Sequence, residues 1–148
     1  QYPRKRLIGH FMQPHQPYLG PTGEQFDYRG DLKRTFQRSD VTRADVLQAY
    51  RENLELVLEE VATLLDDLEG RTVITADHGE VFGQRGWPIP VTLYGHPKRQ
   101  YLPELVEVPW HTYESGSRKE IVPEPPEQDA VDIDAVREHL SNLGYADA

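Results

Sequence analysis

The chain of 148 residues contains no cysteine. Disulfides, zinc ribbons, thiolate metal sites and a cysteine nucleophile are therefore excluded within it, and any metal ion must be held by oxygen and imidazole nitrogen. Long apolar runs are also missing, because none approaches the roughly 18 to 20 residues of a membrane span and no basic start leads into a signal-peptide core. We therefore expect no membrane span and, unless a targeting signal precedes Gln1, a cytoplasmic location.

Lysine is scarce: only four of the 16 basic residues are Lys, whereas Asp and Glu number 25 and the formal net charge is -9. Such a charge opposes non-specific attraction to nucleic acid or to an anionic membrane, so neither is an expected partner. An acid-rich balance with Arg over Lys is typical of proteins that work in high salt, because acidic self-repulsion is screened where the Debye length falls to about 3 Å. The composition favours a halophilic, for instance haloarchaeal, origin over an ordinary acidic protein.

The first apolar run covers residues 6–12 and ends at Pro14-His15-Gln16-Pro17-Tyr18. Two prolines prevent regular structure from continuing there, so we predict a buried strand that leads into a rigid loop. Residues 19–40 show no clear periodicity and indicate a long surface excursion.

From Thr42 to about Leu68, ten apolar residues recur at steps of mostly three and four. This pattern predicts an amphipathic helix with Thr42 or Asp40 at its N-cap and Gly70 at its C-terminal end, and we expect its apolar face to be buried. A β-branched run at 71–76 follows at once. Helix then strand is half of a βαβ unit, so we predict an α/β fold with a mostly parallel sheet flanked by helices.

We assign residues 1–148 to a single domain. Within it we predict an irregular loop at 81–104, a strand at about 105–113, a stiff proline-rich linker at 122–130 and a closing helix at about 132–143.

An aspartate and a histidine stand together where the strand at 71–76 ends, in Asp77-His78-Gly79-Glu80. In parallel sheets, ligands bind beyond the carboxyl ends of the strands. One carboxylate oxygen and one imidazole nitrogen suit zinc or manganese and tolerate calcium or magnesium less well. The pattern indicates either a cation site at Asp77 and His78 or a turn capped by the aspartate.

Two further histidines are held by their neighbours, His15 after Pro14 and His96 before Pro97. His96 is a candidate ligand of a second metal ion or a donor to a bound anion. His15 could donate to an ester oxygen or protonate a leaving group, because imidazole titrates near neutral pH. A structural role in the loop is the alternative for each.

Four motifs stand in a fixed order along the chain: Pro14-His15-Gln16-Pro17-Tyr18, Thr75-Ala76-Asp77-His78-Gly79-Glu80 with Phe82-Gly83, Tyr94-Gly95-His96-Pro97, and Leu140-Ser141-Asn142-Leu143-Gly144-Tyr145. Their order and spacing resemble the sulfatases and related phosphotransferases of the alkaline phosphatase superfamily. The resemblance implies the C-terminal part of a sulfatase-like fold, a partial alkaline-phosphatase-like core. It also implies that Asp77 and His78 ligate the catalytic cation and that His15 and His96 contact the sulfate or phosphate group or, for His96, a second metal ion. Glu80 would support the ligands.

This family carries its nucleophile and its first acidic metal ligands in an N-terminal segment that nothing here matches. Because an attacking oxygen and its cation work as one unit, we expect either a segment of a longer enzyme or a short relative without activity. The implied function is metal-dependent hydrolysis or transfer of a sulfuric or phosphoric ester, with a small-molecule or glycan ester as partner. A non-catalytic metal- and anion-binding module and an acidic structural or interaction domain stay open, as does a homo-oligomer.

Overall fold

The computed structural model describes residues 4–26, 32–37, 40–123, 125 and 133–142, with the backbone alone for 138–142. The chain divides into two compact units. The smaller unit, Gln1–Lys5 with Glu120–Ala148, contains α4 (Ile133–Asn142) and a hydrogen bond from Val122 N to Arg4 O at 3.1 Å. Most of the predicted linker and the end of the 140–145 motif lie outside the described residues.

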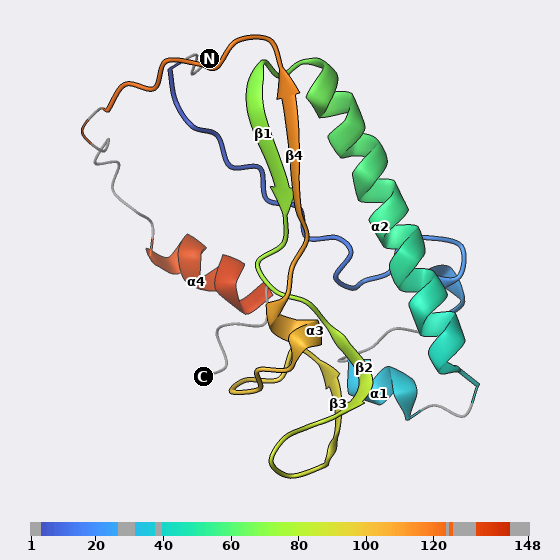
Figure 1. Cartoon of the computed structure of the whole chain (residues 1–148). Coiled ribbons are helices and arrows are strands. Elements are labelled where there is room, and N and C mark those ends of the chain that lie inside the picture. Colours follow the sequence, from blue (N-terminus) through green and yellow to red (C-terminus); the bar gives the residue numbers. More distant parts are fainter. Residues whose placement is uncertain (1–3, 27–31, 38–39, 124, 126–132, 143–148) are drawn as a thin grey trace. The chain divides into compact units, whose positions relative to one another are not determined.

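The larger unit, Arg6–Lys119, contains the remaining elements (Figure 1). In chain order they are η1 (Gly23–Gln25), α1 (Leu32–Phe36), α2 (Arg43–Asp66), β1 (Gly70–Thr75), β2 (Val81–Arg85), β3 (Thr92–Gly95), α3 (Pro103–Val106) and β4 (Trp110–Ser115). None of the helices in the described parts is long and apolar enough to cross a membrane.

The long helix α2 begins where the sequence predicts. Thr42 is its N-cap: the Thr42 side chain accepts a hydrogen bond from Asp45 N at 3.2 Å, and Thr42 N donates to Asp45 Oδ2 at 2.8 Å. This reciprocal pair satisfies amides that the first turn leaves without partners. The other end differs, because Asp67 is the C-cap and Gly70, with a φ of +98°, opens β1.

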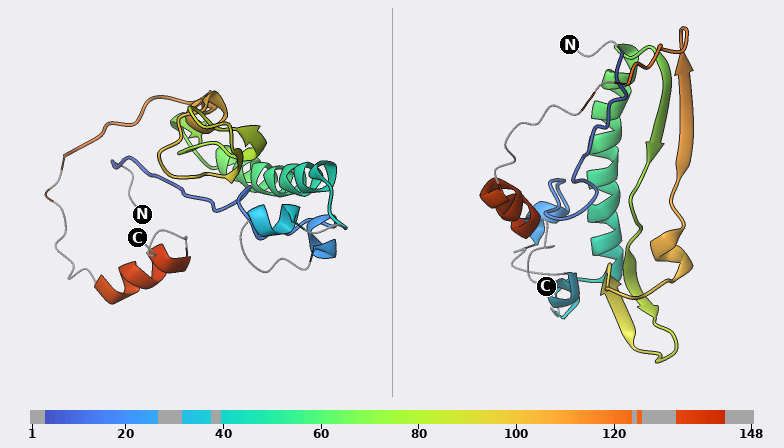
Figure 2. Two further views of the ribbon diagram at one scale, coloured as in Figure 1. Left: turned by 90° about the horizontal axis from the view of Figure 1, so that it is seen from below. Right: turned by 90° about the vertical axis from the view of Figure 1, so that its left-hand side faces the viewer.

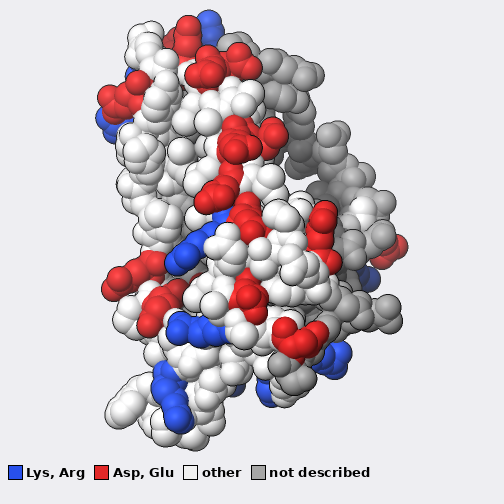
Figure 3. Space-filling view, turned by 90° about the vertical axis from the view of Figure 1, so that its right-hand side faces the viewer, with Lys and Arg blue, Asp and Glu red and all other residues white. Residues whose placement is uncertain are grey.

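The predicted burial of the whole apolar face of α2 is wrong. Only its first half carries fully buried side chains, namely Val46, Ala49 and Asn53, whereas Leu58 and Leu64 farther along are exposed. Figure 3 views the side on which α2 lies and shows acidic side chains running along it, with fewer basic ones.

The prediction of a mostly parallel sheet is also wrong. β1 pairs with β4 in antiparallel register, from Gly70 opposite Ser115 to Thr75 opposite Trp110, and β2 pairs antiparallel with β3. No parallel pair occurs in the part of the chain that the structure describes. Residues 6–12, the expected first strand, are extended without a ladder partner and leave Ile8 94% exposed, so β1 pairs only with the segment that returns after α3 (Figures 1 and 2).

Two small cores hold the larger unit together. One lies where the first half of α2 meets α1 and the β2–β3 ribbon, and the other lies between that ribbon and α3. The buried residues of the first are Tyr18, Leu32, Val41, Val46, Ala49 and Phe82, and those of the second are Val81, Leu93 and Leu105.

Candidate metal and anion site

Three segments that are far apart in the sequence bring histidines together. His15 lies in the proline loop beside α2, His78 in the turn between β1 and β2, and His96 just after β3. The Nε2 atoms of His15 and His96 are 3.5 Å apart, and the ring centroids of His78 and His96 are 4.5 Å apart. Asp77 Oδ2 lies 3.9 Å from His78 Nε2. The four residues singled out in the sequence are therefore neighbours.

Two of the rings have a defined hydrogen-bond direction. His15 Nδ1 lies 2.7 Å from Gln16 O, and His78 Nδ1 lies 2.9 Å from Gly79 O. A carbonyl oxygen can only accept, so both Nδ1 atoms donate and each neutral ring keeps its lone pair on Nε2. Backbone carbonyls orient metal-ligating histidines in this way.

The two Nε2 atoms are farther apart than in a usual hydrogen bond. Nitrogen donors in hydrogen bonds usually lie about 2.7 to 3.2 Å from their acceptors, so 3.5 Å is long for this pair. The two rings are therefore only weakly tied to each other, and their Nε2 atoms can serve a bound ligand.

Asn53 of α2 holds the loop that carries His15. Its side chain is fully buried. Asn53 Oδ1 accepts from Leu19 N at 2.7 Å, and Nδ2 donates to Pro17 O at 3.0 Å and His15 O at 3.2 Å. The sequence analysis missed this residue, although an amide within the buried stripe Val46, Ala49, Asn53 is a readable signal, because a buried polar group must find partners.

Gly79 brings the turn after Asp77 against α3. Gly79 N donates to Leu105 O at 2.9 Å, and a Cβ at this position would overlap Glu104 O. The glycine is therefore needed for the close approach of two backbones.

Glu80 is a half-buried residue beside these histidines, and its Oε1 atom is buried. Its Oε1 has no hydrogen-bond partner among the described residues. Burial raises the pKa of Glu80, although His15 and His78 oppose this shift. Burial also lowers the pKa of His96, and the neighbouring His78 and His15 add to the effect, so His96 favours the neutral form that binds metals.

The donor set fits a divalent cation, with imidazole nitrogens, the exposed Asp77 carboxylate and the unpartnered oxygen of Glu80. In the described ranges, however, no three such side chains already converge as around a bound ion. A cation would have to draw His78 Nε2 and Asp77 Oδ2 closer together than their present 3.9 Å. The arrangement is thus a cluster of oriented ligands and not a closed cage.

Comparison with known proteins adds no family to this description. No protein-family model, no curated protein and no solved structure matches the chain.

Proposed function

We propose that this chain supplies the cation- and oxyanion-binding part of a site for the hydrolysis or transfer of sulfuric or phosphoric esters. The observation that carries the proposal is that His15, His78 and His96 lie side by side, with the Nε2 atoms of His15 and His96 3.5 Å apart. Here the carbonyl bonds of His15 and His78 occupy Nδ1 and leave Nε2 for a ligand.

Asp77 and His78 would hold the cation, for which zinc or manganese is favoured over calcium or magnesium by the mixed oxygen and nitrogen donors. When bound, a divalent cation offsets the negative charge of the ester oxygens. Glu80, two residues after His78 and half-buried, would hold neighbouring ligands in place.

His15 is oriented to act as a proton donor. Because Nδ1–H is held by Gln16 O, a protonated His15 carries its second proton on Nε2, the atom that faces His96. From there the proton can pass to the oxygen of the leaving group. His96, whose pKa is lowered by burial, offers one N–H of its neutral ring to a sulfate or phosphate oxygen.

A second candidate is a binding module without turnover. Thr75, the hydroxyl nearest in sequence to Asp77, donates to Pro109 O at 2.7 Å, so its proton is engaged away from the histidines. This observation favours a site that holds a cation and an anion and lacks a nucleophile of its own.

Turnover assays separate the two candidates. The 148-residue chain and the product of its complete reading frame would each be supplied with zinc or manganese and offered 4-nitrophenyl sulfate and 4-nitrophenyl phosphate. We expect background rates from the 148 residues and metal-dependent turnover from the complete product, reduced by His15→Ala and His96→Ala without loss of fold. Cation-dependent binding of vanadate or sulfate without turnover would select the binding module. Absence of both would overturn the proposal and leave an acidic structural domain.

A further inference from the structure

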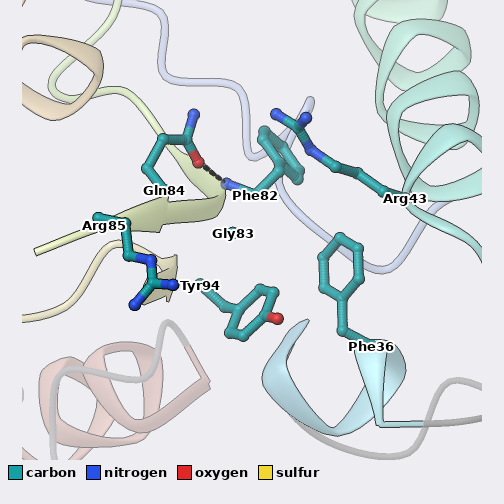
Figure 4. A pocket seen from close by; sticks show the side chains of 7 residues that line it. All are labelled: Phe36, Arg43, Phe82, Gly83, Gln84, Arg85 and Tyr94. Atoms are coloured by element: carbon teal, nitrogen blue, oxygen red, sulfur yellow. Dashed lines mark hydrogen bonds between the residues drawn. The ribbon is translucent and has the colours of Figure 1, made fainter. Parts of the chain in front are cut away.

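An open cavity of about 450 Å³ lies on the β2–β3 ribbon (Figure 4). Its described lining contains two arginines and three aromatic rings but no acidic residue, which is notable in a chain with a formal charge of -9. We call it the arginine pocket. It is lined by Phe36, Arg43, Phe82, Gly83, Gln84, Arg85 and Tyr94.

The ribbon connects this pocket to the histidine cluster. Phe82 and Tyr94 are paired across β2 and β3, the next pair is Val81 with Gly95, and Glu80 and His96 follow immediately. Two residues of extended chain span roughly 7 Å. The aromatic wall of the pocket therefore lies two residues along the same ribbon from Glu80 and His96 of the candidate site.

The aromatic wall is held by its neighbours. Phe36 and Tyr94 lie with ring centroids 4.7 Å apart, and Phe82 meets Tyr50 edge-on at 5.2 Å. Gly83, with a φ of +100°, is the extra residue of a bulge between Phe82 and Gln84. Bulges bend a strand and redirect its side chains, and they are frequent beside binding sites.

Apart from the Tyr94 hydroxyl, which can donate or accept, the polar side chains of the pocket offer donors. Gln84 Oε1 accepts from Phe82 N at 2.5 Å, which leaves the side-chain NH₂ of Gln84 available. Arg85 donates one N–H to Pro90 O at 2.7 Å, and the other N–H groups of its guanidinium remain available. Arg43 forms no ion pair or side-chain hydrogen bond within the described ranges. In Figure 4, Arg43 reaches in from α2 while Arg85 lies on the other side of the rings.

We propose that the arginine pocket binds a ring with an apolar face that carries a carboxylate, sulfonate or sulfate group. Aromatic walls accept the face of the ring, and guanidinium groups bind such anions through charge-assisted hydrogen bonds. The volume lies within the range of about 300 to 1,000 Å³ that is usual for small-molecule pockets. Resting on the proposed function, this ring is the part of the substrate that bears the ester, so the substrate class is an ester with a second anionic group.

The test uses probes without an ester. Benzenesulfonate and glucuronate represent an aromatic and a sugar ring, and benzenesulfonamide and glucose are their uncharged counterparts. Amide NMR spectra of the 148-residue chain would follow Gly83, Arg85 and the side-chain NH₂ of Gln84. We expect one of the two anions to shift these signals in a saturable way and its neutral counterpart to have a much smaller effect. Whichever anion binds more tightly shows whether the pocket prefers an aromatic or a sugar ring.

Charge variants complete the test. Arg43→Gln and Arg85→Gln should each weaken binding of the anion about tenfold, the cost of one charge-assisted hydrogen bond. Arg51→Gln, the same charge change on an exposed residue of α2, should leave it unchanged. Two arginine variants are used so that the test survives if one of them unfolds the chain. Loss of dispersion in the same spectra would reveal unfolding. Equal affinity in all three variants, or no saturable shift with either anion, would overturn the proposal.

Zinc binding separates this inference from the proposed function. Asp77→Ala combined with His78→Ala should lose zinc but keep the anionic probe, whereas Arg43→Gln should keep zinc. If the wild type binds zinc but neither anionic probe, the pocket assignment is refuted. If it binds a probe but not zinc, the cation site is refuted.

Discussion

Asn53→Ala removes an amide that bonds the backbone of the His15 loop at several points. Leu19 N loses its acceptor, and the carbonyls of His15 and Pro17 lose a donor. A buried polar group left without a partner costs about 1 to 3 kcal/mol. Since nearby carbonyls can share other donors and the loop can relax, we expect the free energy of unfolding to fall by about 3 kcal/mol in total. This loss lowers Tm by roughly 6 to 12 °C in a chain of this size.

Thermal and urea unfolding, followed by circular dichroism, would measure this change. Gln48→Ala is the matched control, because Gln48 lies on the same helix and its side chain donates to the half-buried Glu52 side chain, which keeps its bonds to Thr22 without it. Asn53→Asp should be at least as harmful as Asn53→Ala, since it keeps an acceptor for Leu19 N but turns an oxygen toward carbonyl oxygens. If Asn53→Ala were as stable as Gln48→Ala, the amide would not hold the loop.

Three further predictions follow from other parts of the structure. Burial raises the folded-state pKa of Glu80 above the ordinary value of a glutamate, so the stability that Glu80 contributes is complete below that ordinary value and is lost as pH rises through the folded pKa. In metal-free buffer, Glu80→Gln should therefore match the wild type near pH 4 and unfold at a higher temperature near pH 8, and equal midpoints at both pH values would contradict this. Gly79→Ala should lower the free energy of unfolding in urea by about 1 to 3 kcal/mol, because its methyl group would overlap Glu104 O. A midpoint equal to that of the wild type would show that the two backbones can separate freely. Tm should rise between low salt and molar potassium chloride as acidic repulsion is screened, and a flat or falling midpoint would favour an ordinary acidic protein.

Helix α2 was predictable because its determinants are local. The three- and four-residue spacing of apolar side chains and the Thr42 cap both lie within the helix or beside it. The exposed end of the helix was not predictable from this pattern, because periodicity tells which face is apolar and not how much of that face another element covers. Leu64 belongs to the apolar face and is still 47% exposed.

Sheet direction could not be read from the sequence, because it depends on distant partners. The run at 71–76 fits a parallel or an antiparallel strand equally well, and its partner Trp110–Ser115 lies about 40 residues farther along. The predicted strand at 105–113 merged two elements, since 103–106 forms α3 and β4 begins only at Trp110. The predicted irregular loop at 81–104 contains the β2–β3 ribbon.

The candidate site was predicted in its membership and not in its supports. Asp77, His78, His15 and His96 were selected by motif order, and they do lie together. Asn53 and Gly79, which position the loops around them, act through contacts with segments remote in sequence. The resemblance to sulfatases stays a prediction, as does the metal-dependent chemistry that it implies.

Zinc titration of the 148-residue chain by isothermal calorimetry tests the central claim most directly. The wild type should bind zinc, His78→Ala should weaken binding by at least about tenfold, which is the cost of losing even an outer-shell partner of a metal ligand, and Asp77→Ala combined with His78→Ala should abolish it. His111→Ala is the control, because His111 is exposed on β4 and its loss should change nothing. Equal zinc uptake by the wild type and the Asp77, His78 double variant would contradict the account.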